Sequence, residues 1–300
     1  MQLSANGISI EVDDQGPPGA PPILLIMGLG MQLTGWPEEL VRMLVARGYR
    51  VIRLDNRDAG LSQGFEKSGV PNLAWATLRF LLRLPLSAPY ALADMAADAL
   101  GVLDALGIRK AHVCGASMGG MIAQHIAASQ PDRVARLTLI MTTSGARRLP
   151  QPSVKVRRAL IEPRASGPHD AAREVERLMR LFTLIGSPAY RPDPEDYRAR
   201  LAASVQRAWR PSGVARQLIA VAADGDRTPM LSRISAPTHI VHGAADPLIP
   251  VAAARDLHAR IAGSTLEIIE GMGHDLPAAL WPRLAAAIGM TPSPSGRGPG

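Results

Sequence analysis

A serine flanked by glycines is the residue best placed to do chemistry. Ser117 lies within Gly115-Ala116-Ser117-Met118-Gly119, after the apolar run 111–114 and before a helical run that starts at Met121. A G-x-S-x-G pattern between a strand and a helix is typical of a nucleophilic serine on a sharp turn. Glycines relieve the crowding in such a turn, so the serine oxygen stands exposed above the sheet. A glycine-rich turn with an incidental serine is the alternative.

A serine hydroxyl needs a base, and the base needs an acid that orients it. Among seven histidines, His274 is favoured because it follows the last predicted strand in a loop of small residues, Gly271-Met272-Gly273. His242 ends an earlier strand and is a weaker candidate. The remaining five are expected to be structural or solvated: His112, His125, His169, His239 and His258.

Asp246 is the candidate acid, since it follows the strand that precedes the His274 strand. Both residues fall at the carboxyl ends of strands, where open α/β sheets place their ligand crevice. Asp275 is adjacent to the histidine but cannot readily curl back to its Nδ1. The earlier strand is followed by residues 142–144, which carry no carboxylate. A turn role before Pro247 is the alternative for Asp246.

Two backbone N–H groups are candidates for binding a developing oxyanion. Met118 lies at a helix N-terminus, where negative charge is favoured. The second donor is expected from the loop Met27-Gly28-Leu29-Gly30-Met31, with Leu29 preferred to Gly28. The same glycines could instead mark only a tight turn.

Short apolar runs alternate with amphipathic helical stretches, which predicts an α/β fold with a mostly parallel sheet covered by helices on both faces. Helices are expected over 38–47 and 91–106, each closed by a glycine, and Asp94, Asp98 and Asp104 of the second are expected to face water. The expected strands are Ile8–Val12, Ile23–Met27, Arg50–Leu54, Ala111–Cys114, Leu137–Met141, His239–Val241 and Leu266–Ile269.

This alternation stops between Met141 and His239, where helical patterns cover 171–185, 195–209 and 214–223. So long a stretch without a strand predicts a helical insertion between two late core strands. We therefore expect a core over 1–145, a helical cap over 146–234, the rest of the core over 235–290, and a disordered tail rich in Pro, Gly and Ser over 291–300.

The composition narrows the class of protein. The 300 residues are 47% hydrophobic and 20% charged, which argues against disorder and against a fibrous fold. The single Cys114 excludes an internal disulfide. The first residues lack the pattern of a secretory signal, and the longest apolar run is too short to cross a bilayer. A cytoplasmic protein without cofactor or metal is expected.

The net charge of +7 is unevenly distributed. Residues 147–233 contain 17 basic and 9 acidic residues. The rest of the chain contains 16 basic and 17 acidic residues, so the excess positive charge belongs to residues 147–233. Since 30 of the 33 basic residues are arginine, GC-rich coding bias is the simple interpretation. The alternative is a basic cap that steers anionic substrates. No nucleic-acid-binding motif accompanies the charge, so nucleic acid is not an expected partner.

From Ile8 to about Ile288, the chain resembles the α/β-hydrolase superfamily. It is most similar to a bacterial serine carboxylesterase subgroup that contains aclacinomycin methylesterase. The residues that carry this likeness are Ile26–Gly30, Trp36-Pro37, Leu54–Ser62 and Gly115–Gly120.

The resemblance implies a serine-dependent ester hydrolase with a helical cap and with Leu29 and Met118 as the oxyanion hole. Gly28, Trp36 and Met272 are candidate substrate contacts. Many relatives have His-Gly where this chain has Met27-Gly28, so the relatives' substrate preference does not transfer.

The expected function is therefore hydrolysis of small to medium apolar carboxylic esters through an acyl-enzyme, with a homodimer possible. Carbon–carbon bond or lactone hydrolysis and haloperoxidase-like perhydrolysis without a cofactor are alternatives on the same three residues. A non-catalytic ligand-binding protein on this scaffold is a remote alternative.

The loop with Asp55, Arg57 and Asp58 is expected to be structural. Asp224, Asp226 and Arg227 are expected to tie the cap to the core.

Overall fold

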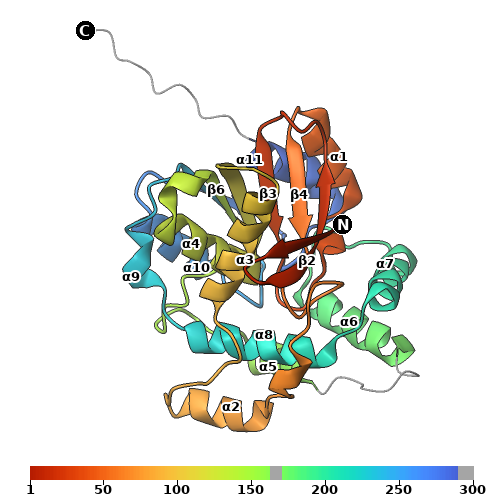
Figure 1. Ribbon diagram of the computed structural model, residues 1–300. Coiled ribbons are helices and arrows are strands. Elements are labelled where there is room, and N and C mark those ends of the chain that lie inside the picture. The colour runs from red at the N-terminus through yellow and green to blue at the C-terminus, as the bar shows by residue number, and fades with distance from the viewer. Residues whose placement is uncertain (163–170, 290–300) are drawn as a thin grey trace.

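The computed structural model describes residues 1–162 and 171–289, so the predicted tail over 291–300 lies outside the described residues. Within those ranges eight strands form one sheet in the order β1-β2-β4-β3-β5-β6-β7-β8 (Figure 1). Pairs β1/β2 and β2/β4 are antiparallel, and every other pair is parallel, which confirms the expected sheet. The strands are β1 Gln2–Ala5, β2 Ile8–Gln15, β3 Pro22–Ile26, β4 Arg50–Leu54, β5 Ala111–Ala116, β6 Val134–Ile140, β7 Thr238–Gly243 and β8 Thr265–Ile269.

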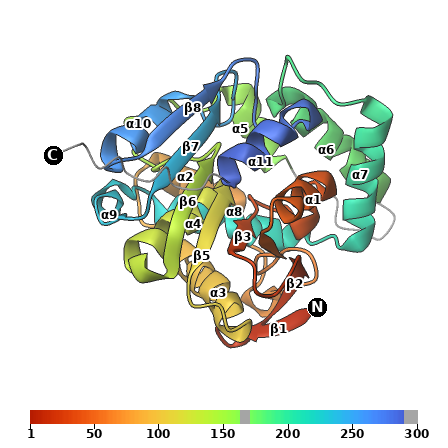
Figure 2. The same cartoon turned by 90° about the horizontal axis from the view of Figure 1, so that it is seen from above.

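Helices cover both faces of this sheet, as Figure 2 shows from above. One apolar cluster packs β3 and β5 against α3 (Leu92–Ala105), α4 (Met118–Ser129) and α10 (Ala252–Arg260). A second cluster on the opposite face involves α1 (Glu38–Ala46) and α11 (Trp281–Ile288). The central strands are therefore buried on both sides, which explains their short, continuously apolar sequences.

Between β6 and β7 the described residues form five helices, so the expected cap between late strands is confirmed. α6 and α7 pack around a small apolar cluster of their own, centred on Val175, Leu201 and Val205. The sequence patterns predicted α6, α7 and α8 but neither α5 nor α9. The five are α5 Val154–Ile161, α6 Ala171–Ile185, α7 Pro194–Arg207, α8 Pro211–Asp224 and α9 Thr228–Leu231.

β1, α2 and α11 are further elements that were not predicted. β1 pairs with β2 through a tight turn at Asn6 and Gly7, both with positive φ, a signal of a hairpin that the sequence does contain. α2 (Leu73–Leu81) contains no buried residue. Short 3-10 helices lie at Leu33–Gly35, Glu66–Ser68, Pro131–Arg133 and Ala278–Leu280.

The expectation that Asp98 faces water is wrong. Asp98 is 1% exposed, and its carboxylate accepts hydrogen bonds from Nε and Nη2 of Arg57 at 2.6 and 2.7 Å. The helical periodicity marked it as polar but gave no sign of a cation on a distant loop. The ion pair supplies the partner that a buried carboxylate requires.

Within residues 1–162 and 171–289, no helix is long and apolar enough to cross a membrane. The same ranges contain no group of three or more His, Cys, Asp or Glu placed to hold a metal ion.

Candidate active site

Ser117 lies on the sharp turn between β5 and α4 with φ 55° and ψ −120°, a strained conformation for a residue with a side chain. The glycines around it are required by close backbone contacts. A Cβ on Gly115 would lie 2.1 Å from the Gly119 carbonyl oxygen, and a Cβ on Gly119 would lie 2.0 Å from that of Ile26. The backbones of β3, β5 and α4 therefore contact each other directly, with no space for a side chain between them. This is why the pattern needs glycine at both positions.

The strained turn is held from β6. The Ser117 N–H donates to the Ile140 carbonyl at 2.9 Å, and the Thr142 hydroxyl donates to the Ser117 carbonyl at 2.7 Å. Both backbone groups of the serine are thus satisfied, and its side chain is left to point away from the sheet. No motif in the sequence pointed to Thr142.

Three residues from distant parts of the chain form one line of hydrogen bonds. Ser117 Oγ lies 3.0 Å from His274 Nε2, and His274 Nδ1 lies 2.7 Å from Asp246 Oδ2. The carboxylate can only accept, so Nδ1 donates to it and Nε2 is free to take the serine proton. Asp246 and His274 are 5% and 6% exposed. The geometry suits proton transfer from the serine to the imidazole.

Backbone donors fix the carboxylate of Asp246. Its Oδ1 accepts hydrogen bonds of 2.8 Å from the N–H groups of both Leu248 and Ile249. His242, the weaker base candidate, is fully buried and bonded through Nε2 to the Ile249 carbonyl at 2.7 Å. Burial lowers the pKa of His242, which keeps its imidazole neutral beside Asp246.

The loop that carries the histidine is fastened to the end of α6. The His274 N–H donates to the Ile185 carbonyl at 2.7 Å, and the Gly273 N–H donates to Ser187 Oγ at 2.9 Å. Ser187 in turn donates to the carboxylate of Asp275 through both its N–H and its hydroxyl. Asp275 therefore holds the cap, not the imidazole. No motif in the sequence pointed to Ser187.

The loop after β3 lies beside the serine. A Cβ on Gly28 would be 3.0 Å from Ser117 Cβ, and the side chain of Leu29 packs in the same apolar cluster as Met118. Across the described ranges, the N–H groups of Leu29 and Met118 have no hydrogen-bond partner. Met118 is also the first residue of α4, where the helix dipole favours an anion.

The other two suggested substrate contacts lie elsewhere. Trp36 and Met272 are both 0% exposed, in the apolar cluster that packs against α1 and α11. Their contact with substrate stays a prediction, and full burial favours a packing role.

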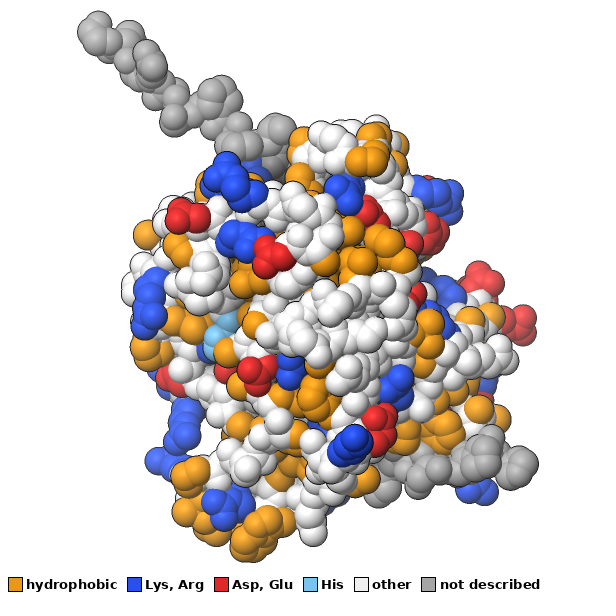
Figure 3. Space-filling view, in the orientation of Figure 1, with side chains coloured by type: hydrophobic (Ala, Val, Ile, Leu, Met, Phe, Trp, Pro, Cys, Tyr) orange, Lys and Arg blue, Asp and Glu red, His pale blue; other side chains and the backbone are white. Residues whose placement is uncertain are grey.

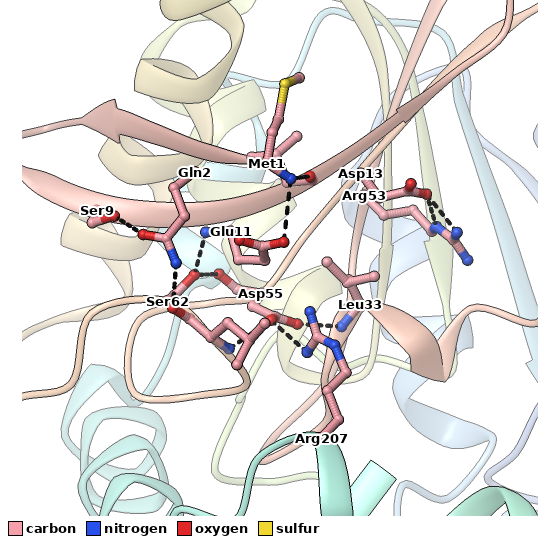
Figure 4. A network of polar contacts seen from close by, with 12 residues as sticks. Met1, Gln2, Ser9, Glu11, Asp13, Leu33, Arg53, Asp55, Ser62 and Arg207 are labelled. Carbon is pink, nitrogen blue, oxygen red and sulfur yellow. Dashed lines mark hydrogen bonds and ion pairs between the residues drawn. The ribbon is translucent and has the colours of Figure 1, made fainter. Parts of the chain in front are cut away.

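Cap residues reach the core loops next to this site. Arg207 Nη1 of α7 donates to Asp55 Oδ2 at 2.7 Å, while the Leu33 N–H donates to Asp55 Oδ1 (Figure 4). In α8, Arg216 forms two hydrogen bonds to Asp58 at 2.7 and 2.8 Å, and both side chains are fully buried. The loop with these two aspartates is thus structural, as expected.

The carboxyl of Asp58 responds to opposing effects. Burial acts to raise its pKa, but hydrogen bonds from Arg216, the Phe65 N–H and the Tyr90 hydroxyl outweigh it, so the pKa is lowered. At the other end of α8, Asp224 bonds to His125 at 2.8 Å, and Arg227 donates to the Thr143 carbonyl at 3.0 Å. These two tie the cap to the core as predicted, whereas the Asp226 carboxylate accepts a hydrogen bond from the N–H of Thr228, two residues further along the chain.

A family model described as "alpha/beta hydrolase fold" matches residues 21–277. The chain belongs to the α/β-hydrolase family. Among curated members, it is 33% identical to rhodomycin D methylesterase of Streptomyces peucetius over 95% of both chains. It is 30% identical to a 2-hydroxy-6-oxononadienedioate/2-hydroxy-6-oxononatrienedioate hydrolase of Klebsiella pneumoniae, over 89% of this chain and 85% of the relative.

Solved structures agree on the fold of this α/β hydrolase. A meta-cleavage product hydrolase from Pseudomonas fluorescens superposes with a TM-score of 0.71 at 20% identity, over 95% of this chain and 94% of that one. The relatives of this chain thus include a methylesterase and a hydrolase of 2-hydroxy-6-oxo dienedioates.

Proposed function

We propose that this protein is a serine hydrolase that cleaves carboxylic esters of small to medium apolar substrates. The observation that carries the proposal is the line Ser117 Oγ, His274 Nε2, His274 Nδ1, Asp246 Oδ2, with its two hydrogen bonds of 3.0 and 2.7 Å. It starts on the strained turn, beside two N–H groups that have no hydrogen-bond partner among the described residues. The methylesterase relative makes methyl esters the first substrates to test.

The first half of the reaction forms an acyl-enzyme. Ser117 Oγ attacks the ester carbonyl carbon, and its proton moves to His274 Nε2. The N–H groups of Leu29 and Met118 hold the negative oxygen of the tetrahedral intermediate, and Asp246 stabilises the imidazolium. The carbon–oxygen bond to the alcohol then breaks, and His274 returns the proton to the departing oxygen.

The second half releases the acid. His274 Nε2 takes a proton from water, whose oxygen attacks the acyl carbon of the ester on Ser117. The second tetrahedral intermediate expels Ser117 Oγ, which regains the proton from His274, and the carboxylic acid leaves. No further reactant is needed.

Labelling with a fluorophosphonate probe, followed by hydrolysis of p-nitrophenyl and methyl esters, tests this function. The native chain should be labelled and active, and Ser117→Ala should lose both while remaining folded by circular dichroism. Loss of about 10³-fold or more in kcat is expected. Ester hydrolysis by Ser117→Ala near the native rate would refute the proposal.

Carbon–carbon bond or lactone hydrolysis on the same residues is the second candidate, favoured by relatives that the chain matches at 30% and 26% identity. A screen of esters, enol-lactones and 2-hydroxy-6-oxo dienoic acids at matched concentration separates the candidates by kcat/KM. A preference for enol-lactones or for 2-hydroxy-6-oxo dienoic acids would replace the assignment to open-chain esters without altering the role of Ser117.

A further inference from the structure

Exposed apolar side chains are concentrated around α2. Among the described residues, 11 large apolar side chains are exposed, and seven of these lie between positions 70 and 84. Their exposed fractions run from 44% to 75%, which is unusual for a group of this size. We call them the α2 patch: Val70, Trp75, Leu78, Phe80, Leu81, Leu82 and Leu84.

The α2 patch lies on a part of the fold that projects from the body. α2 is at the lower end of the molecule in Figure 1, below α8, and apolar side chains gather over that end in Figure 3. The helix contacts α8, and a cavity of about 630 Å³ beside this contact is lined by Trp75, Ala76 and Ile219 among others. The helix is therefore a raised element with an unpartnered apolar surface.

The charges in this segment have one sign. From residue 67 to residue 93 the chain carries Lys67, Arg79 and Arg83 and no Asp or Glu. Nε and Nη2 of Arg79 donate to the Pro85 carbonyl, which is uncharged, and its guanidinium lies 6.0 Å from the centre of the Trp75 ring. Within the described ranges neither Lys67 nor Arg83 forms an ion pair. Glu66, just outside the segment, is paired with Arg210 at 3.2 Å.

Aromatic and leucine side chains beside cations that lack a carboxylate partner would complement a lipid surface, which has an apolar interior beneath a layer of anionic headgroups. Amphipathic helices with Trp, Phe and Leu on one side and Arg or Lys at the margin lie in the plane of a lipid headgroup layer. Anionic lipids attract such cations, whose long stems let the charge reach the headgroups. α2 is only 9 residues long, which suits a helix lying on a bilayer.

A second copy of the chain fits less well. A symmetric dimer through this patch would bring Arg79 and Arg83 of one protomer near the same residues of the other, and no carboxylate lies in the segment to compensate. Like charges across an interface oppose association. The charge thus favours an anionic partner.

We propose that the α2 patch docks the protein on an anionic lipid surface. Trp75, Leu78 and Leu81, which lie three residues apart on one exposed side of α2, enter the boundary between headgroups and acyl chains, while Arg79 and Arg83 contact lipid phosphates. The proposal concerns binding and does not depend on the reaction at Ser117.

Sedimentation of the full chain with vesicles tests it. Vesicles of phosphatidylcholine containing phosphatidylglycerol should bind the chain, vesicles of phosphatidylcholine alone should bind it far less, and salt should weaken binding. The double variant Leu78→Ser/Leu81→Ser and the single variant Arg83→Glu should each bind roughly tenfold more weakly. Trp75 fluorescence, taken as the difference from Trp75→Phe, should shift to the blue on binding.

Matched control variants separate this surface from general charge and apolarity. Val154→Ser/Ile161→Ser removes two exposed apolar side chains on α5, and Arg47→Glu makes the same charge change at the end of α1. Both should bind lipid like the native chain. Equal weakening by Arg47→Glu would assign binding to overall charge and overturn the proposal.

Two other results would also overturn it. One is absence of binding to the phosphatidylglycerol vesicles. The other is a lipid-free dimer that Leu78→Ser/Leu81→Ser dissociates, which would make a second copy the partner. Circular dichroism and ester hydrolysis of the α2 variants in lipid-free buffer should match the native chain.

Discussion

Gln217 Oε1 accepts a hydrogen bond of 2.8 Å from the N–H of Gly30, so a cap helix holds the loop beside Ser117. The Nε2 of the same side chain donates to the Arg57 carbonyl at 2.7 Å. Gln217 is 0% exposed, and no solvent can replace either bond. α8 therefore fixes the position of the loop that carries the Leu29 N–H.

Gln217→Met keeps the size of the side chain and removes both hydrogen bonds. We expect kcat for ester hydrolysis to fall about 10- to 100-fold with a smaller change in KM, because the oxyanion donor loses its support. Gln217→Glu retains the acceptor for Gly30 and should lose less. Steady-state kinetics on one aryl ester measure both, with thermal melts as the control for folding. An unchanged kcat in Gln217→Met would show that the loop holds its position without this contact.

Asp246 and Asp275 are near His274 but have different partners, which makes them a matched pair. Asp246→Asn should reduce kcat by about 10³- to 10⁴-fold, because an amide does not stabilise the imidazolium. Asp275→Asn should reduce it far less, because that carboxylate contacts Ser187. If both variants lose kcat equally, Asp246 has no special role as the acid.

The buried pair Arg216 and Asp58 should contribute strongly to stability once one partner is removed. Arg216→Met leaves a buried carboxylate without its cation and should lower the free energy of unfolding by about 3–5 kcal/mol. Arg42 pairs with Glu39 at 2.7 Å on the surface. Arg42→Met should lower the free energy of unfolding by less than about 1 kcal/mol. Urea unfolding gives both values. Similar losses in the two variants would contradict the importance of burial.

His112 predicts a pH dependence of stability. Burial, together with the charge of Arg136, lowers its pKa from 6.5 to about 3. The unfolded chain therefore binds a proton at a higher pH than the folded chain does. Stability from this group is fully present above 6.5 and is lost as the pH falls toward the folded value of about 3.

At about pH 5 the loss should be about 2 kcal/mol relative to neutral pH. His112→Gln keeps a polar partner for Thr138, which lies 2.9 Å from Nε2, and removes the titration. Urea unfolding at both pH values should show a smaller loss in this variant. If the free energy of unfolding fell equally with pH in the native chain and in His112→Gln, the lowered pKa of His112 would be contradicted.

Features set by contiguous residues were predictable. The turn at Ser117 needs a strand, two glycines and a helix in immediate succession, and the contacts of Gly115 and Gly119 show why no other residue fits. The alternation of apolar strands and amphipathic helices likewise predicted the sheet. Gly7 and Asn6 were also readable as a hairpin signal, although the first strand was not predicted.

Features that depend on how the cap lies on the core were not predictable. Gln217 and Gly30 are 187 positions apart, and their contact depends on the rotation of α8 about its axis.

Contacts between distant parts of the core were not predictable either. Asp98 had the periodicity of a solvated residue because helical spacing carries no information about Arg57. The apolar run around Phe80 contains no feature that tells an exposed helix from a buried one, and the fold leaves it exposed.

The buried pair of Arg216 with Asp58 also bears on which parts of the chain unfold together. α8 contributes Arg216, Gln217 and Ala220 to buried contacts with the core, whereas α6 and α7 pack mainly on each other. In hydrogen-exchange mass spectrometry, the amide protons of α8 should therefore exchange with solvent as slowly as those of the sheet. The amide protons of α6 and α7 should exchange earlier. By position in the chain α8 is part of the insertion, but by cooperativity it is part of the core.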